Sequence, residues 1–338
     1  MTVLGCSTNP PKRHHNIAFV VIGRNEGERL RRCLQSVLPQ ACEVLYVDSG
    51  STDESVAMAR GLGVHVVELD MSCTFTAARA RNEGFRCLRI LAPGIELVHF
   101  LDGDCEIVQG WLEAALALMT QQADVAAVGG RNCERFPDHS IYNLLYSLEW
   151  NRAEPGETRY CGGNALMRVA AIAEVGGFRE NLIAGEEPEM CVRLRAKGWR
   201  IWRLDADMAW HDAAMLHFSQ WWKRSMRTGY AFAEGAHIHG APPERHFVQE
   251  TNSGWGWGLM LPLLLAIAAY ASGPMMLWGA AIYPLQMLRL YWPRRALPRA
   301  GALYAVFTVL SKFPQALGQL KCVSNRLSGR RAQLIEYK

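Results

Sequence analysis

The sequence predicts an α/β protein in which helices flank a mostly parallel sheet, followed by a C-terminal hydrophobic helical hairpin. Three observations support this fold class. Short apolar runs rich in β-branched residues alternate with segments of helical spacing in the first part of the chain. Two of these runs end directly in an aspartate, Asp48 and Asp102. Residues 251–288 contain no charged side chain, enough for nearly two membrane-spanning helices of about 20 residues each.

The expected elements follow in order along the chain. Residues 1–16 are expected to be a flexible leader, and residues 17–235 a folded α/β domain. Ser51 and Glu54 have the spacing of a capping box for the second helix. Residues 133–160 have weaker periodicity and are expected to pass over the sheet. The expected strands are 17–22, 44–47, 64–68, 97–101, 125–128, 199–204 and a short one ending at 210–212; the expected helices are 28–38, 55–62, 76–91, 111–121 and one from 188 to 197.

Composition excludes several classes of protein. Half of the 338 residues are hydrophobic and 20% are charged, so the chain is not disordered. A net charge of +4 is too small to indicate nucleic-acid binding. The ten cysteines contain no C-x-x-C pair, which favours buried free thiols in a reducing compartment. The first 16 residues lack the apolar core of a secretory signal, so we expect this part of the chain in the cytosol.

Acidic residues follow two neighbouring strands of the predicted sheet. Asp48 and Asp102 end apolar runs, and Asp104 follows after Gly103. The carboxyl ends of parallel strands meet at one edge of a sheet, where ligands bind. Paired carboxylates there could hold a divalent cation. Asp102 and Asp104 could instead be turn formers or helix N-caps before the helix at Trp111.

Later motifs allow both a structural and a functional interpretation. The paired glycines before Asn164 fit a close backbone approach or a bulge. Glu186 and Glu187 precede Pro188, which fits a site or simply the start of a helix. His211 could be a ligand or a structural histidine. The basic-aromatic segment 220–227 could form a solvated helix or border a site for an anionic, amphipathic substrate.

The last hundred residues are predicted to contact a membrane. Residues 236–254 are expected to be a linker, and residues 255–292 a hairpin broken near Gly273 that spans or enters a bilayer. A core hairpin of a soluble domain is the alternative. Residues 293–338 form a basic amphipathic tail at the membrane surface, in which 302–320 is an interfacial helix or a third crossing. Two crossings keep both chain ends cytoplasmic.

Taken together, the motifs of residues 16–231 resemble family 2 glycosyltransferases, which have the GT-A fold with a Rossmann-like sheet. The C-terminal hydrophobic part resembles bacterial members that build exopolysaccharide or other surface glycans. Five motifs occur in the family's order: the first-strand loop at 22–26, the second at 47–53, a phosphate-side helix at 80–84, the D-x-D motif at 102–104 and an acidic motif at 185–190.

This resemblance implies a donor site for a nucleotide sugar. Asp48 would accept a hydrogen bond from the nucleobase, commonly uracil, and Arg81 would add positive charge near the diphosphate. Mg²⁺ or Mn²⁺ would be held by Asp104, with Asp102 and His211 as further ligands. The residues that the resemblance assigns to the nucleotide sugar are Asn25, Glu26, Asp48, Arg81, Asp102, Gly103 and Asp104.

The resemblance also implies an acceptor site and a base. Glu187 occupies the position of the family's general base, with Glu186 as the rival, and transfer would invert the anomeric carbon. A short membrane part favours transfer of a single sugar to a glycan, with a polyprenyl-diphosphate-linked glycan as the leading hypothesis. The enzyme would lie at the inner membrane with its catalytic domain facing the cytoplasm. The acceptor and diphosphate region would comprise Gly163, Asn164, Gln220, Trp221, Trp222 and Arg224.

Two other classes of function remain as alternatives. A Rossmann-type dinucleotide-binding oxidoreductase would need a G-x-G-x-x-G turn after the first strand, which residues 23–27 lack. A catalytically silent membrane scaffold could keep the same fold, although it would not need all of the acidic motifs.

Overall fold

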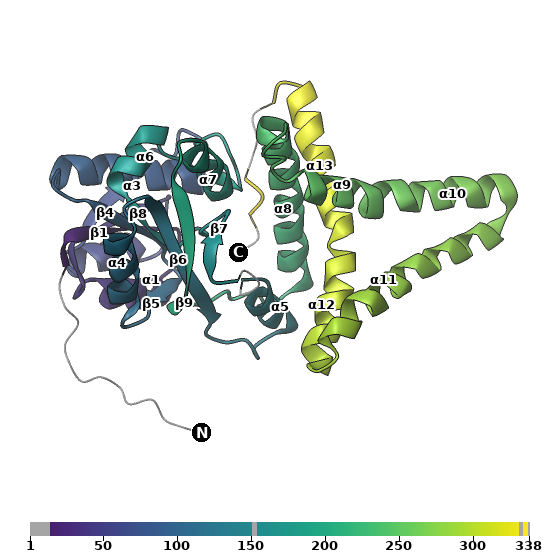
Figure 1. The fold of residues 1–338 in the computed structure, drawn as a ribbon, viewed down its shortest axis with the longest axis horizontal. Helices are drawn as coiled ribbons and strands as arrows, with labels where there is room; N and C mark the ends of the chain where they lie inside the picture. Colours follow the sequence, from purple (N-terminus) through teal and green to yellow (C-terminus); the bar gives the residue numbers. More distant parts are fainter. Residues whose placement is uncertain (1–13, 151–153, 331–333, 337–338) are drawn as a thin grey trace.

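The computed structural model describes residues 14–150, 154–330 and 334–336. Most of the expected leader lies outside these residues, but its last three residues belong to the first strand, which begins at His14. The backbone N–H of His14 donates to Gln40 O, which ties this strand start to the next strand. Figure 1 shows an α/β domain, a central layer formed by α8 Phe218–His239 and α13 Lys312–Leu327, and a helical hairpin that projects away from the sheet.

The first half of the sheet is parallel, as predicted. Its spatial order is β3-β2-β1-β4, and all three pairings are parallel. The apolar side chains of β1, β2 and β4 are buried on both faces, the pattern of a central parallel sheet, and those of the edge strand β3 are half-buried. These strands are β1 His14–Gly23, β2 Ala41–Asp48, β3 His65–Glu68 and β4 Leu97–Asp102.

The second half of the sheet is mixed, because β8 runs antiparallel to both β4 and β6. The two short strands expected at 199–204 and 210–212 are one continuous strand, β9, which pairs in parallel with an extended β6. Irregularities in the β6–β9 register let both strands reach beyond the sheet core. The remaining strands are β5 Cys105–Ile107, β6 Val125–Glu134, β7 Gly156–Thr158, β8 Ala165–Arg168 and β9 Arg200–His211.

Helices cover both faces of the sheet and close two hydrophobic cores. Helices α1 Glu28–Val37, α2 Ser55–Gly61 and α4 Trp111–Gln121 pack on one face. Helices α3 Ala77–Leu91, α6 Val169–Val175 and α7 Glu186–Ala196 pack on the other. Helix α3 lies so close to β1 that a Cβ at Gly84 would collide with Val20.

The capping box predicted at Ser51 and Glu54 is wrong, and the N-cap alternative for Asp102 and Asp104 is excluded. The N-cap of α2 is Glu54 and makes no side-chain cap bond; Ser51 instead bonds to Asp48 and to the backbone of Asn25. The N-cap of α4 is Gly110, in the left-handed region at φ 87°. Asp102 and Asp104 therefore do not cap this helix, which removes that structural explanation for the two carboxylates.

The C-terminal helices fold back onto the α/β domain. Helix α8 Phe218–His239 runs into the expected linker, which also contains all but the last residue of α9 Val248–Trp255. Helix α12 Pro298–Leu310 is followed by α13 Lys312–Leu327, and the one-residue break between them, Ser311, lies inside the expected interfacial helix. A Cβ at Gly229 or Gly318 would collide with the backbone of the facing helix, so α8 and α13 cross at these glycines. One face of the tail is thus bound by protein.

Glu234, on α8, gives a testable consequence of this helix packing. Burial raises the pKa of its carboxyl to about 7, against the opposing charge of Arg326, and its Oε2 has no hydrogen-bond partner within the described chain. A folded-state pKa above the unfolded value means that stability is lost as pH rises from about 4.5 to 7. We expect Glu234→Gln to remove this loss, raising the free energy of unfolding at pH 7.5 by roughly 1–3 kcal/mol. Urea unfolding at pH 5 and 7.5 measures it; an unchanged pH slope would contradict it.

The hairpin has the apolar, exposed surface that its sequence predicts. Within the described residues, one continuous helical run, Val248–Ser272, is long and apolar enough to cross a membrane, with a mean hydropathy of 1.5 and only 6% of its most apolar window buried. Leu264 and Trp278 are 58% and 80% exposed. The hairpin comprises a π-helix Gly256–Met260, α10 Leu261–Ser272, a 3₁₀ segment Pro274–Ala281, α11 Ile282–Tyr291 and a final 3₁₀ turn Trp292–Arg294.

Candidate active site

The loops after β1 and β2 are fastened to each other. Asp48 is almost fully buried, and its carboxylate accepts from Tyr46 Oη at 2.8 Å and from the backbone N–H groups of Gly50 and Ser51 at 2.9 and 2.8 Å. Asn25, at φ 55°, accepts from the Thr52 N–H through its Oδ1 at 2.7 Å. Asp48 and Asn25 therefore build the two loops at this sheet edge.

Arg81 links two of the predicted acidic motifs. Its guanidinium is 3% exposed and donates to Glu186 Oε1 at 2.7 Å and to Asp102 Oδ1 at 2.9 Å. Burial lowers the pKa of Arg81, but the two carboxylates outweigh burial and raise it. A Cβ at Gly163 would lie 2.9 Å from Arg81 Nη2, so the glycine leaves room for this buried cation. The structure thus joins residues from α3, β4 and α7 in one polar cluster.

The loop before β8 holds the end of β4. Asn164 is fully buried; its Oδ1 accepts from the Asp102 N–H at 2.8 Å, and its Nδ2 donates to Cys105 Sγ at 3.2 Å. Gly103, between the two aspartates, donates its N–H to Ile22 O at 2.8 Å. Asn164 and Gly103 consequently fix the backbone of the D-x-D turn.

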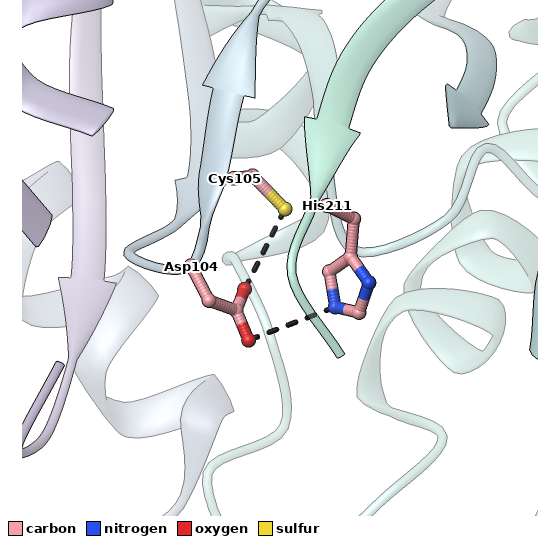
Figure 2. Close-up of side chains that lie close together, drawn as sticks. All are labelled: Asp104, Cys105 and His211. Atoms are coloured by element: carbon pink, nitrogen blue, oxygen red, sulfur yellow. Dashed lines mark hydrogen bonds and ion pairs between the residues drawn. The ribbon is translucent and has the colours of Figure 1, made fainter. Parts of the chain in front are cut away.

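Asp104 and His211 face each other across neighbouring strands (Figure 2). Asp104 Oδ2 lies 3.6 Å from His211 Nε2, and both residues are buried. The antiparallel register of β5 and β9 pairs Cys105 with His211, which explains why residues a hundred positions apart meet. The Cys105 thiol lies 3.5 Å from Asp104 Oδ1.

This pair fits a hard divalent cation. A separation of 3.6 Å exceeds a good hydrogen bond but suits two ligands of one ion, and carboxylate oxygen with imidazole nitrogen is a donor set that Mn²⁺ accepts. Asp102 instead directs Oδ1 to Arg81. Asp104 and His211 are therefore the better-placed ligands of the three residues predicted from sequence.

Sequence reasoning missed Glu134, which lies behind His211. Glu134 Oε2 lies 3.0 Å from His211 Nδ1, and its side chain is 1% exposed. A carboxylate on one imidazole nitrogen fixes the tautomer and leaves the other nitrogen for a ligand. The imidazole also stacks on Tyr146, with ring centroids 4.8 Å apart. Glu134 ends a strand longer than its sequence pattern indicated, so no local signal marked it.

The two candidate bases have different surroundings. Glu187 is 5% exposed, and its Oε1 accepts from the Cys161 N–H at 2.8 Å and from the thiols of Cys161 and Cys191 at 3.1 and 3.0 Å. Glu186 pairs with Arg81. Both side chains leave the first turn of α7, so the structure brings the acidic motif next to the loop before β8.

The basic-aromatic segment forms the first turns of α8. Gln220 Oε1 accepts from the backbone N–H groups of Leu216 and His217, in a capping box. Trp221 is buried and packs on Phe307 of α12. Arg224 contacts Glu149 at 2.7 Å and lies over the ring of Tyr146. Gln220 and Trp221 thus have structural contacts.

Two further predicted residues sit at the edge of these clusters. Trp222 is half-buried and packs against Phe218. Glu26, in the loop after β1, forms an ion pair at 2.8 Å with Arg29 in the first turn of α1. Tyr146 stacks on His211 and also lies under the guanidinium of Arg224, so Arg224 contacts the ring that packs on His211.

Comparison with known proteins shows which family the α/β domain is similar to. Residues 18–176 match the sequence model of glycosyl transferase family 2. A pre-mycofactocin glycosyltransferase of Mycobacterium tuberculosis is 31% identical over 204 residues, 56% of this chain and 41% of its own length. The succinoglycan biosynthesis protein ExoU of Rhizobium meliloti is 27% identical, over 55% of this chain and 58% of its own. The chain therefore spans about two fifths of the length of the mycobacterial relative.

Solved structures agree on the fold. The mannosyltransferase PcManGT of Pyrobaculum calidifontis superposes with a TM-score of 0.62 at 19% identity, over 94% of this chain and 91% of its own. Residues 1–349 of S. aureus TarS superpose with a TM-score of 0.50 at 14% identity, over 93% and 92%. At these identities the likeness shows a shared GT-A-like fold. Residues 18–176 are therefore similar in sequence to family 2 glycosyltransferases, and the chain shares a GT-A-like fold.

Proposed function

We propose that this chain transfers a single sugar from a nucleoside-diphosphate sugar to a hydroxyl of a glycan acceptor, with inversion, and that it requires Mg²⁺ or Mn²⁺. The observation that carries the proposal is the facing pair of Asp104 and His211, 3.6 Å apart at the sheet edge where the D-x-D turn and the Arg81 cluster meet. PcManGT was solved in complex with GDP-Man and Mn²⁺, which supports this class of donor and metal.

The residues of the cluster divide the chemistry between them. When bound, the cation neutralises charge on the departing diphosphate as a Lewis acid. Asp104 and His211 would hold that cation, and Arg81 would direct its positive charge towards the same diphosphate. The loops fastened by Asp48 and Asn25 would form the wall that receives the nucleobase, with a UDP-linked sugar as the proposed donor.

Glu187 is proposed as the general base. An acceptor hydroxyl becomes an effective nucleophile only when its proton is removed during attack. Glu186 is already paired with the buried Arg81, whereas Glu187 has no ion pair with a described residue. Cys161 and Cys191 hold the Glu187 carboxylate in place at the start of α7. Glu186 would then act by positioning Arg81.

A donor panel tests the proposed function. UDP- and GDP-linked sugars, and separately NAD(P), are titrated into the full chain by calorimetry, with and without Mn²⁺, and release of the nucleoside diphosphate is followed with each nucleotide sugar that binds. We expect one class of nucleotide sugar to bind only when Mn²⁺ is present. Absence of binding by every donor would favour a silent scaffold, and binding of NAD(P) instead would favour an oxidoreductase.

Glu134→Gln tests the Asp104–His211 pair through the contact that Glu134 makes with His211 Nδ1. The change keeps the size of the side chain but weakens its hold on His211 Nδ1, so we expect Mn²⁺ affinity to fall by about 10- to 100-fold. Mn²⁺ binding is measured by electron paramagnetic resonance, without any transfer reaction. Glu157→Gln, at an exposed carboxylate of β7, is the control. Equal affinity in the two variants would remove Glu134 from the site.

The acceptor is proposed to be lipid-linked and the enzyme to act at the cytoplasmic face of the inner membrane. Relatives named for succinoglycan and O-antigen biosynthesis support a surface glycan. The exposed apolar hairpin and the following arginines support contact with anionic membrane lipids.

Polar substitutions in the hairpin test this placement. We expect Leu264→Gln with Trp278→Gln to reduce flotation of the chain with anionic vesicles several-fold, because each removes exposed apolar surface. Activity on a soluble acceptor fragment should persist, whereas transfer to a lipid-linked acceptor should fall. The same double change at exposed Ile90 and Leu91 of α3 is the matched control. Unchanged flotation would place the hairpin outside the membrane.

A further inference from the structure

A second cluster of ligand-type side chains lies at the start of α7. It consists of Cys161, Glu187 and Cys191, which are 8%, 5% and 0% exposed. Glu187 Oε1 lies 3.1 Å from Cys161 Sγ and 3.0 Å from Cys191 Sγ, and the two sulfurs are 3.8 Å apart. Three potential ligand atoms therefore surround one point, away from the Asp104–His211 pair.

The spacing has a specific chemical meaning. Two thiolates bound to one tetrahedral zinc at about 2.3 Å lie about 3.8 Å apart, which is the separation of Cys161 and Cys191. A disulfide would need about 2.05 Å, so the two cysteines are free thiols. Glu187 and Cys191 are four residues apart on one helix and share a face, while Cys161 approaches from the loop before β8.

The two thiols of the cluster carry protons that a bound cation could replace. Burial raises the pKa of the Cys161 thiol well above its usual value and that of Cys191 to about 11, with Glu187 adding to both effects. Both thiols are therefore protonated at neutral pH and donate to the Glu187 carboxylate. Binding of a divalent cation would break two S–H bonds, form two metal–sulfur bonds and release two protons to solvent.

We propose that Cys161, Cys191 and Glu187 form a binding site for a soft divalent cation such as Zn²⁺ or Cd²⁺, and that this cation inhibits transfer by occupying Glu187. The inhibition rests on the proposed role of Glu187, whereas the site itself does not. Thiolate ligands select soft ions, while the carboxylate and imidazole of Asp104 and His211 suit Mg²⁺ or Mn²⁺. One chain would thus hold an activating and an inhibiting cation at separate sites.

Cadmium titration tests the site without any reaction. The full chain carries Cys105→Ser, which removes the thiol beside Asp104 as a competing ligand. It is kept reduced and saturated with Mn²⁺. We expect one Cd²⁺ to bind with a thiolate charge-transfer absorption, and calorimetry in buffers of different ionisation enthalpy to give two protons released. Adding Cys161→Ser or Cys191→Ser should weaken binding by at least about 100-fold, and adding Cys73→Ser, at an exposed thiol, should not.

The outcomes separate the site from the proposed function. Equal Cd²⁺ affinity in the Cys161, Cys191 and Cys73 variants, or binding without proton release, would overturn the site. The proton count on the chain with both thiols intact decides the matter if a serine variant unfolds. Zn²⁺ should inhibit sugar transfer by the chain with both thiols, but not by Cys161→Ser. Cd²⁺ binding without Zn²⁺ inhibition would overturn the inhibition and the assignment of Glu187 as base, and leave the site standing.

Discussion

Asp104→Ala is expected to lower the rate of sugar transfer by about 10²- to 10³-fold or more, with the fold preserved. The carboxylate faces His211 Nε2 at 3.6 Å, and its loss removes one of two proposed protein ligands to the cation that stabilises the departing diphosphate. Mn²⁺ affinity, measured by electron paramagnetic resonance, should fall in parallel. Donor binding should then lose its dependence on Mn²⁺.

A matched control lies just before the start of β6, at the end of the strand opposite Glu134. Asp124 is an exposed aspartate paired with Arg200, just before β6 begins, so Asp124→Ala removes a carboxylate without touching the site. It should keep full transfer and full Mn²⁺ affinity. Full transfer by Asp104→Ala, or a loss of equal size in Asp124→Ala, would contradict the assignment of Asp104 as a metal ligand.

Glu187→Gln is expected to lower kcat by about 10²- to 10⁴-fold while donor affinity stays near that of the unchanged chain. The amide cannot take the acceptor's proton, yet it still accepts from the Cys161 N–H and both thiols, so the helix start should keep its geometry. Steady-state kinetics combined with donor calorimetry separates these two effects.

Glu186→Gln should behave differently, which makes it the discriminating partner. It removes one of the two carboxylates paired with a guanidinium that is 3% exposed and leaves Asp102 as the remaining partner, so the buried charge is less well compensated. We therefore expect weaker donor binding and a lower melting temperature, with a smaller effect on kcat. The reverse pattern, with kcat lost in Glu186→Gln and kept in Glu187→Gln, would exchange the roles of the two residues. Glu174→Gln, at an exposed carboxylate, is the control.

The positions of Asp48 and Asp102 at one sheet edge could be predicted, because the ends of parallel strands can be recognised from consecutive residues. Asp48 and Asp102 follow apolar runs that can only be strands, and parallel strands bring their carboxyl ends to one edge. The exposed apolar hairpin followed in the same way from an uncharged run broken at Gly273. Periodicity and strand ends are properties of consecutive residues, so the sequence alone contains them.

Other contacts depend on where distant elements pack. Glu134 meets His211 only because β6 and β9 pair far beyond the core of the sheet, in a register set by irregular residues. The mixed half of the sheet arises because β8 inserts antiparallel between β4 and β6. The sequence predicted Gln220 and Trp221 as site residues without indicating the contacts that the fold gives them, in which Gln220 caps α8 and Trp221 packs on Phe307.

The sequence by itself determined the α/β class, the order of the donor-side motifs and the apolar hairpin, because hydrophobic spacing and strand-end chemistry act over a few residues. Only the tertiary structure decided that Asp102 pairs with Arg81 while Asp104 faces His211. It also decided that Cys161 and Cys191 meet at Glu187. These pairings bring together residues that are far apart in the chain, and register and helix packing, which no local pattern encodes, set their distances.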